Sequence, residues 1–177
     1  MAAVAGANRR IVLALATAAL GLPALAFAAT PLPDPGSPLL WSTVDVCDSA
    51  AHPDVIGIRG SMPGTGDALQ QMTMRFTVEY LDTEHHWRYL PAANSGAVAL
   101  GSASVRARQA GWDFTIAPSS KGYTLRGVVV FEWRIGTATA VQEVRSTTAG
   151  HPSSVGADPP GYSAATCRIR RTAAGRS

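Results

Sequence analysis

The feature that most constrains the fold is a nine-residue run, 72–80, in which apolar and polar side chains alternate without interruption. Met72, Met74, Phe76, Val78 and Tyr80 are apolar, and the four residues between them are polar. Because successive side chains of a strand point to opposite faces, this pattern predicts a β-strand with one buried face. It argues against an amphipathic helix, whose apolar residues recur every three or four positions.

The same two-residue period recurs along the chain. Alternating segments lie at 112–116, 129–135 and 139–145, and shorter candidate strands at 41–47, 55–60, 86–90, 97–105 and 162–169. Clusters of glycine, proline, serine and asparagine separate them and predict turns. Eight or nine short strands at this spacing predict an all-β fold in which two antiparallel sheets pack as a sandwich.

The N-terminus has the three parts of a secretory signal peptide. Arg9 and Arg10 precede an uncharged apolar run, and small residues at Ala26 and Ala28 fit a signal peptidase site. We therefore expect residues 1–28 to be removed and the protein to be secreted. The alternative is a membrane anchor, but the apolar run is shorter than the about 20 residues that a spanning helix needs. We expect no membrane span after cleavage.

The remaining chain divides into three parts. Residues 29–40 contain four prolines and predict an extended linker. Residues 41–169 are long enough for one sandwich domain, and residues 170–177 form a basic tail that we expect to be flexible. Residues 29–167 carry nine basic and 12 acidic side chains, so the basic character of the chain comes from its ends. This distribution provides no basic face and argues against a nucleic-acid partner.

Two cysteines, Cys47 and Cys167, lie near the two ends of the predicted domain. In an exported protein they predict a disulfide, which would place the last strand near the first and protect a sheet edge. Closing a loop of this length stabilises a fold by about 4–5 kcal/mol in the chain-entropy model. The alternative is a pair of free thiols. A zinc site is not expected, because zinc sites use closely spaced ligands.

The segment 116–118, apolar-x-Pro, is followed by Tyr123 and an alternating run to Val129. This arrangement resembles fibronectin type III and immunoglobulin-like domains, in which a tyrosine starts the strand after such a segment. The resemblance implies that the Tyr123 hydroxyl bonds back to upstream backbone in a tyrosine corner. Residues 72–135 are also similar to secreted immunoglobulin-like proteins of high-GC bacteria. The cysteine pair departs from that of antibody domains, which join strands B and F.

Four tryptophans bear on both the core and a binding surface. Trp112 and Trp133 lie on alternating apolar faces, so we expect both to fill the core, and either is a candidate for the central tryptophan. Trp87 and Tyr89 share one face of a short strand. They are the aromatic residues that we expect to face a ligand, if any do.

No catalytic motif is present in the sequence. The surroundings of Ser61 lack the Gly-x-Ser-x-Gly pattern, and we expect no enzyme activity, cofactor or metal ion. One turn, with Asp82, Glu84, His85 and His86, offers a candidate metal or hydrolase site. Adjacent histidines on a strand point to opposite faces, however, and rarely reach one ion.

The leading hypothesis is a non-enzymatic extracellular module that binds a protein or a glycan. The alternatives are a small secreted hydrolase built around Asp82, His85 and His86, and a passive envelope or matrix component.

Overall fold

The computed structural model describes residues 31–170, except residues 118, 120 and 154. The predicted signal peptide and the tail beyond residue 170 lie outside this part of the chain. Residues 31–40 precede the first strand without regular structure, and they contact the domain. The Gln70 side-chain amide donates to the Pro31 carbonyl at 3.0 Å, and the Arg145 guanidinium donates to the Pro35 carbonyl at 2.9 Å.

The described residues form eight strands. They are β1 (Trp41–Cys47), β2 (Val55–Pro63), β3 (Gln70–Leu81), β4 (Trp87–Ser102), β5 (Ala107–Thr115), β6 (Tyr123–Ile135), β7 (Ala138–Ser146) and β8 (Cys167–Ile169). The all-β prediction is confirmed. Two candidate strands, 86–90 and 97–105, are parts of the single long strand β4. The candidate 162–169 is a strand only in its last three residues.

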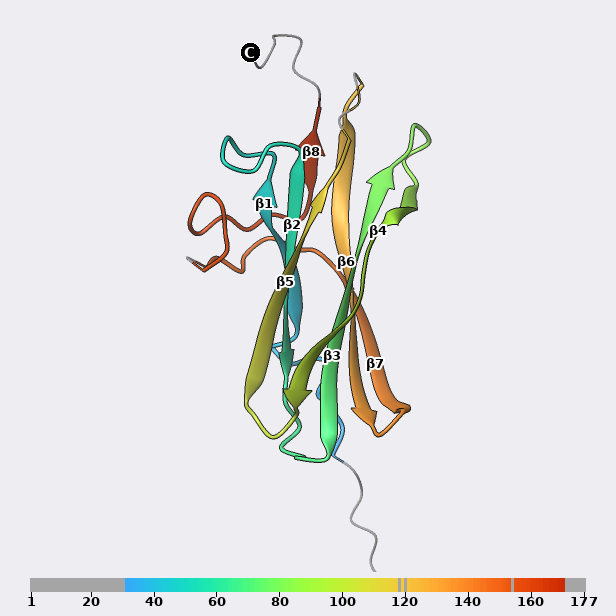
Figure 1. Ribbon diagram of the computed structural model, residues 1–177, viewed down its shortest axis with the longest axis vertical. Coiled ribbons are helices and arrows are strands. Elements are labelled where there is room, and N and C mark those ends of the chain that lie inside the picture. Colours follow the sequence, from blue (N-terminus) through green and yellow to red (C-terminus); the bar gives the residue numbers. More distant parts are fainter. Residues whose placement is uncertain (1–30, 118, 120, 154, 171–177) are drawn as a thin grey trace, which may run out of the picture.

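The strands form two antiparallel sheets that pack as a sandwich (Figure 1). One sheet has the order β1-β2-β5. The other has the order β4-β3-β6-β7, and β8 pairs with the beginning of β6. Hairpins join β1 to β2, β3 to β4 and β6 to β7. The connections from β2 to β3, from β4 to β5 and from β5 to β6 cross between the sheets, whereas β7 and β8 belong to the same sheet. The predicted immunoglobulin-like or fibronectin III-like sandwich is confirmed.

The core lies between the sheets and follows the alternation read from the sequence. Met72, Met74, Phe76 and Val78 of β3 are fully buried, and their polar neighbours point outward. Trp133 of β6 is also fully buried, and its indole N–H donates to the Pro63 carbonyl at 3.0 Å. Trp133 is therefore the central tryptophan of the core.

The expectation that Trp112 also fills the core is wrong, because 43% of its surface is exposed. Trp112 lies opposite Ile58 of β2, on the inward-facing side of β5. Within the described chain, β5 pairs only with β2 and forms the margin of its sheet. A side chain that points inward from an edge strand has a neighbouring strand on only one side, so part of its surface stays exposed.

A disulfide joins Cys47 at the end of β1 to Cys167 at the start of β8, as predicted. The free edge of β1 is covered by the loop before β8. Val44 exchanges backbone hydrogen bonds with Ala164, and the Asp45 carbonyl accepts the Asp158 amide. The return of the chain thus protects the β1 edge. The described residues contain no helix that is long and apolar enough to cross a membrane.

Candidate functional site

An apolar pocket of about 590 Å³ opens between the two sheets, where the edge strands β4 and β5 face each other. Its floor consists of Phe114, Ile116 and Leu125, which belong to the hydrophobic core. Tyr80 from the end of β3 and Tyr123 from the start of β6 also line it. The pocket is therefore an opening into the core and not a groove on the outer surface.

The pocket exists because β4 leaves the ladder that it forms with β3. Asn94 of β4 pairs with Thr77, and Tyr89 pairs with Glu79, so a two-residue step on β3 matches a five-residue step on β4. The four residues between, 90–93, form a bulge, and three of them line the pocket. One bulge residue is a proline, which has no N–H for a ladder hydrogen bond. The bulge withdraws β4 from the regular sheet and leaves the space open.

The polar groups of the pocket come mainly from its two tyrosines. The Tyr80 and Tyr123 rings meet edge to face with their centroids 6.4 Å apart. Among the described residues, neither tyrosine hydroxyl has a hydrogen-bond partner. Tyr123 is the first residue of β6, as the resemblance implies. The hydrogen bond of a tyrosine corner is not found within the described residues, and that role of Tyr123 stays a prediction.

The sequence-predicted pair Trp87 and Tyr89 lies on the outer face of the larger sheet and outside the apolar pocket. The two residues pair with Leu81 and Glu79. The Arg126 guanidinium covers the Trp87 ring, 4.4 Å from its centroid, and also pairs with Glu79 at 2.6 Å. Tyr89 is 46% exposed. Trp87 therefore already has a cation as its partner, and the ligand-facing role of the pair stays a prediction.

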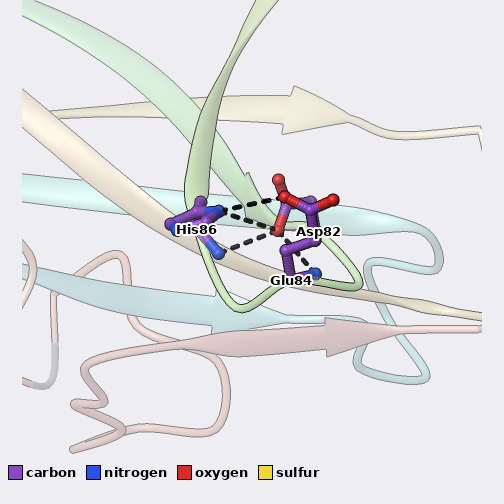
Figure 2. A group of neighbouring side chains, drawn as sticks. All are labelled: Asp82, Glu84 and His86. Carbon is purple, nitrogen blue, oxygen red and sulfur yellow. Dashed lines mark hydrogen bonds and ion pairs between the residues drawn. The ribbon is translucent and has the colours of Figure 1, made fainter.

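The turn between β3 and β4 brings Asp82, Glu84 and His86 together (Figure 2). Their candidate ligand atoms all lie within 4.8 Å of one another. One Asp82 oxygen accepts the amides of Glu84 and His86, and the other accepts the Arg88 side chain at 2.8 Å. The hydrogen bond from Arg88 is the main cause that lowers the pKa of Asp82 to about 2. Asp82 thus holds the turn in place.

The histidines of this turn are exposed to solvent. His86 has 61% of its side chain exposed, and His85 is exposed and adopts a left-handed backbone conformation. Neither of the two pockets described in this subsection contains any of these residues. A hydrolase built around Asp82, His85 and His86 would need a pocket in which they converge, so the geometry gives this alternative no support.

Sequence reasoning missed a second cluster, in which Asp158 accepts hydrogen bonds from Ser49 and from the His52 ring. These bonds, led by that from Ser49, lower the pKa of Asp158. The Ser49 hydroxyl donates to the carboxylate and accepts the His52 backbone amide, but it does not bond to the His52 ring, so the order of groups differs from that of a catalytic triad. The cluster ties the β1–β2 turn to the loop that covers β1. No local signal reveals it, because Asp158 is more than 100 residues from both Ser49 and His52.

A polar pocket of about 380 Å³ lies on the outer face of the smaller sheet, between β5 and the covering loop. Asp45 and Arg59 line it, and both are 5% exposed. Burial is the main cause that raises the pKa of Asp45 to about 6, against the attraction of Arg59. The sequence offered one clue to this pocket, since Arg59 is the one charged residue of β2.

Comparisons with known proteins do not add to this geometry. No family model matches the chain, and no curated protein matches it significantly.

Proposed function

We propose that the chain is a secreted, non-enzymatic binding module that takes a small apolar molecule into the pocket between its sheets. The observation that carries this proposal is the apolar pocket of about 590 Å³, whose floor is the hydrophobic core itself. Small-molecule sites are concave, mostly apolar and about 300–1,000 Å³ in volume, with a few polar groups that orient the ligand.

The lining of the pocket indicates the chemistry of its ligand. Phe114, Ile116 and Leu125 can only offer apolar contact, whereas the two tyrosine hydroxyls can each bond a polar group. The described lining contains no charged residue. An aromatic or branched aliphatic molecule with one hydroxyl or carbonyl group fits this combination best.

The expected affinity is modest. A ligand that buries on the order of 250 Å² of apolar surface gains about 6 kcal/mol from the hydrophobic effect. Part of this gain is lost with the translational and rotational freedom of the ligand. We therefore expect a dissociation constant in the micromolar range or weaker.

Secretion is part of the proposal and rests on the N-terminal pattern together with the disulfide. The Cys47–Cys167 bond forms and persists in oxidising compartments, which is consistent with folding outside the cytoplasm. Mass spectrometry of protein isolated from culture medium tests this part. We expect a mature N-terminus at Ala29 and no free thiol, and an intact leader on the isolated protein would contradict it.

The binding proposal is tested with N-phenyl-1-naphthylamine, a neutral dye whose fluorescence rises in apolar surroundings. We expect saturable enhancement with the wild-type domain. Ala92 lines the pocket and is exposed, so Ala92→Phe should fill the mouth without disturbing the core. We expect this variant to bind the dye about tenfold more weakly.

The matched control is Ala97→Phe, which adds the same ring at an exposed position of β4 outside the pocket. This variant should bind the dye as the wild type does. Enhancement that does not saturate, or equal binding by the two variants, would refute the proposal.

A further inference from the structure

The polar pocket on the outer face of the smaller sheet is open because two glycines lie beneath it. Arg59 of β2 faces Gly111 of β5, and Asp113 of β5 faces Gly57 of β2. A Cβ atom on Gly57 would lie 2.7 Å from an oxygen of Asp113 and 2.9 Å from an oxygen of Asp45. The missing side chain lets both carboxylates converge over one point of the sheet.

Arg59 is incompletely paired. Its Nη1 donates to the Val155 carbonyl, but its Nε lies 3.7 Å from the Asp45 carboxylate, too far for a hydrogen bond. Nε and Nη2 are buried and have no hydrogen-bond partner among the described residues. Buried polar groups in native proteins are nearly always paired, so two unpaired N–H groups of a buried cation indicate a missing acceptor.

The charges around the pocket sum to one negative charge when both of its carboxyls are ionised, and to zero when Asp45 is protonated. Arg59 contributes one positive charge, and Asp45 and Asp113 contribute two negative charges when both are ionised. Because the pKa of Asp45 is raised to about 6, this carboxyl carries a proton below that pH and can then donate a hydrogen bond. The Asp113 carboxylate would repel a strongly anionic ligand, and the Arg59 guanidinium would repel a cationic one. The pocket therefore favours a neutral ligand.

The groups present both donate and accept hydrogen bonds at close spacing. Arg59 donates, Asp113 accepts, and the side-chain amide of Gln109, which also lines the pocket, does both. Adjacent hydroxyl groups on one rigid ring would match such a mixture, since each hydroxyl donates once and accepts as well. Val155 at the rim is 78% exposed and offers an apolar surface to the C–H groups of the ring.

We propose that this pocket is a carbohydrate subsite that holds one neutral pyranose unit of an extracellular glycan. The hydroxyl oxygens of the sugar accept hydrogen bonds from Arg59, and its O–H groups donate hydrogen bonds to the carboxylates of Asp113 and Asp45. The site lies on the opposite side of the smaller sheet from the apolar pocket, and it does not depend on the proposed function. The two sites can therefore be tested separately on the same protein.

The test is an NMR titration of the ¹⁵N-labelled domain with the methyl glycosides of glucose, galactose, mannose and N-acetylglucosamine. Sodium acetate and ethylammonium chloride serve as the anionic and cationic probes. We expect at least one glycoside to shift the amide signals of Gly57, Gly111 and Gly156 saturably at millimolar concentration. The charged probes should give no saturable shifts there. Failure of all four glycosides, or saturation by a charged probe alone, would overturn the proposal.

A variant pair makes the assignment specific. Asp113→Ala removes an exposed carboxylate from the pocket and should weaken glycoside binding about tenfold. Glu84→Ala removes an exposed carboxylate outside it and should leave the affinity unchanged. If Asp113→Ala binds the glycoside as tightly as the wild type, the sugar is not held in this pocket. A spectrum of each variant without ligand verifies that the fold is intact.

Discussion

The raised pKa of Asp45 makes the stability of this protein depend on pH in an unusual direction. In an unfolded chain the carboxyl titrates near 3.8, and in the folded protein near 6. The folded state therefore binds this proton more tightly than the unfolded state. The resulting stabilisation is fully present below pH 3.8 and is lost as the pH rises through 6. At about 1.4 kcal/mol for each unit of pKa, the difference across this range is about 3 kcal/mol.

Asp45→Asn isolates this effect, because asparagine has nearly the same shape and does not titrate. We expect the variant to gain about 2.5 kcal/mol relative to the wild type between pH 4 and pH 7, because most of the difference falls within this range. The measurement is the free energy of unfolding in urea at each pH, for both proteins with the disulfide intact. Any effect of the changed contact with Arg59 adds a constant to the free energy of unfolding of the variant. Such a constant does not alter how the difference between the two proteins varies with pH.

Asp34→Asn is the control, because it makes the same chemical change at an exposed position outside the polar pocket. The reasoning would be refuted by a free-energy difference between wild type and Asp45→Asn that stays constant with pH, or by one that changes in the opposite direction.

Three further predictions concern the stability of the fold. Cys47→Ser should lower the free energy of unfolding by about 4–5 kcal/mol, because it removes a crosslink over 120 residues, and urea melts that match the wild type would contradict this value. Trp133→Phe should cost about 2–3 kcal/mol, because it loses buried volume and the bond to a backbone carbonyl, whereas Trp112→Phe should cost less than about 1 kcal/mol. Thermal unfolding measures the stability lost in each variant. Equal losses would contradict the assignment of Trp133 as buried and of Trp112 as partly exposed. Gly57→Ala should destabilise by about 1–3 kcal/mol, because a Cβ there would come within 2.9 Å of three side-chain atoms, whereas Gly111→Ala meets its nearest atom at 3.4 Å and should be tolerated. In urea melts, Gly57→Ala should therefore unfold at a lower urea concentration than Gly111→Ala, and the reverse order would contradict the prediction.

The fold could be read from the sequence to the extent that it depends on local alternation. The run from Met72 to Tyr80 fixes the buried face of β3, and the positions of the two cysteines allow their pairing. Local alternation does not tell whether a strand is central or marginal. Trp112 and Trp133 therefore look alike in the sequence, although one lies at a sheet margin and the other at the centre of the core.

The two pockets could not be predicted, because each depends on residues that are distant in the chain. The apolar pocket requires the register slip of β4 between Thr77 and Glu79, and the proline at position 91 does not tell how many residues leave the ladder there. The polar pocket combines β1, β2 and β5 with a loop residue near position 155. Trp87 and Tyr89, the aromatic pair that the sequence predicted to face a ligand, line neither pocket.

The bulge in β4 also affects how molecules of this protein meet one another. A regular outer strand would present a row of unpaired backbone groups, on which a second copy could extend the sheet. Because residues 90–93 leave the ladder and include a proline, that row is interrupted midway along the strand. The bulge that opens the apolar pocket thus also discourages edge-to-edge aggregation. Without the bulge, the pocket would close and β4 would present a continuous row of unpaired backbone groups.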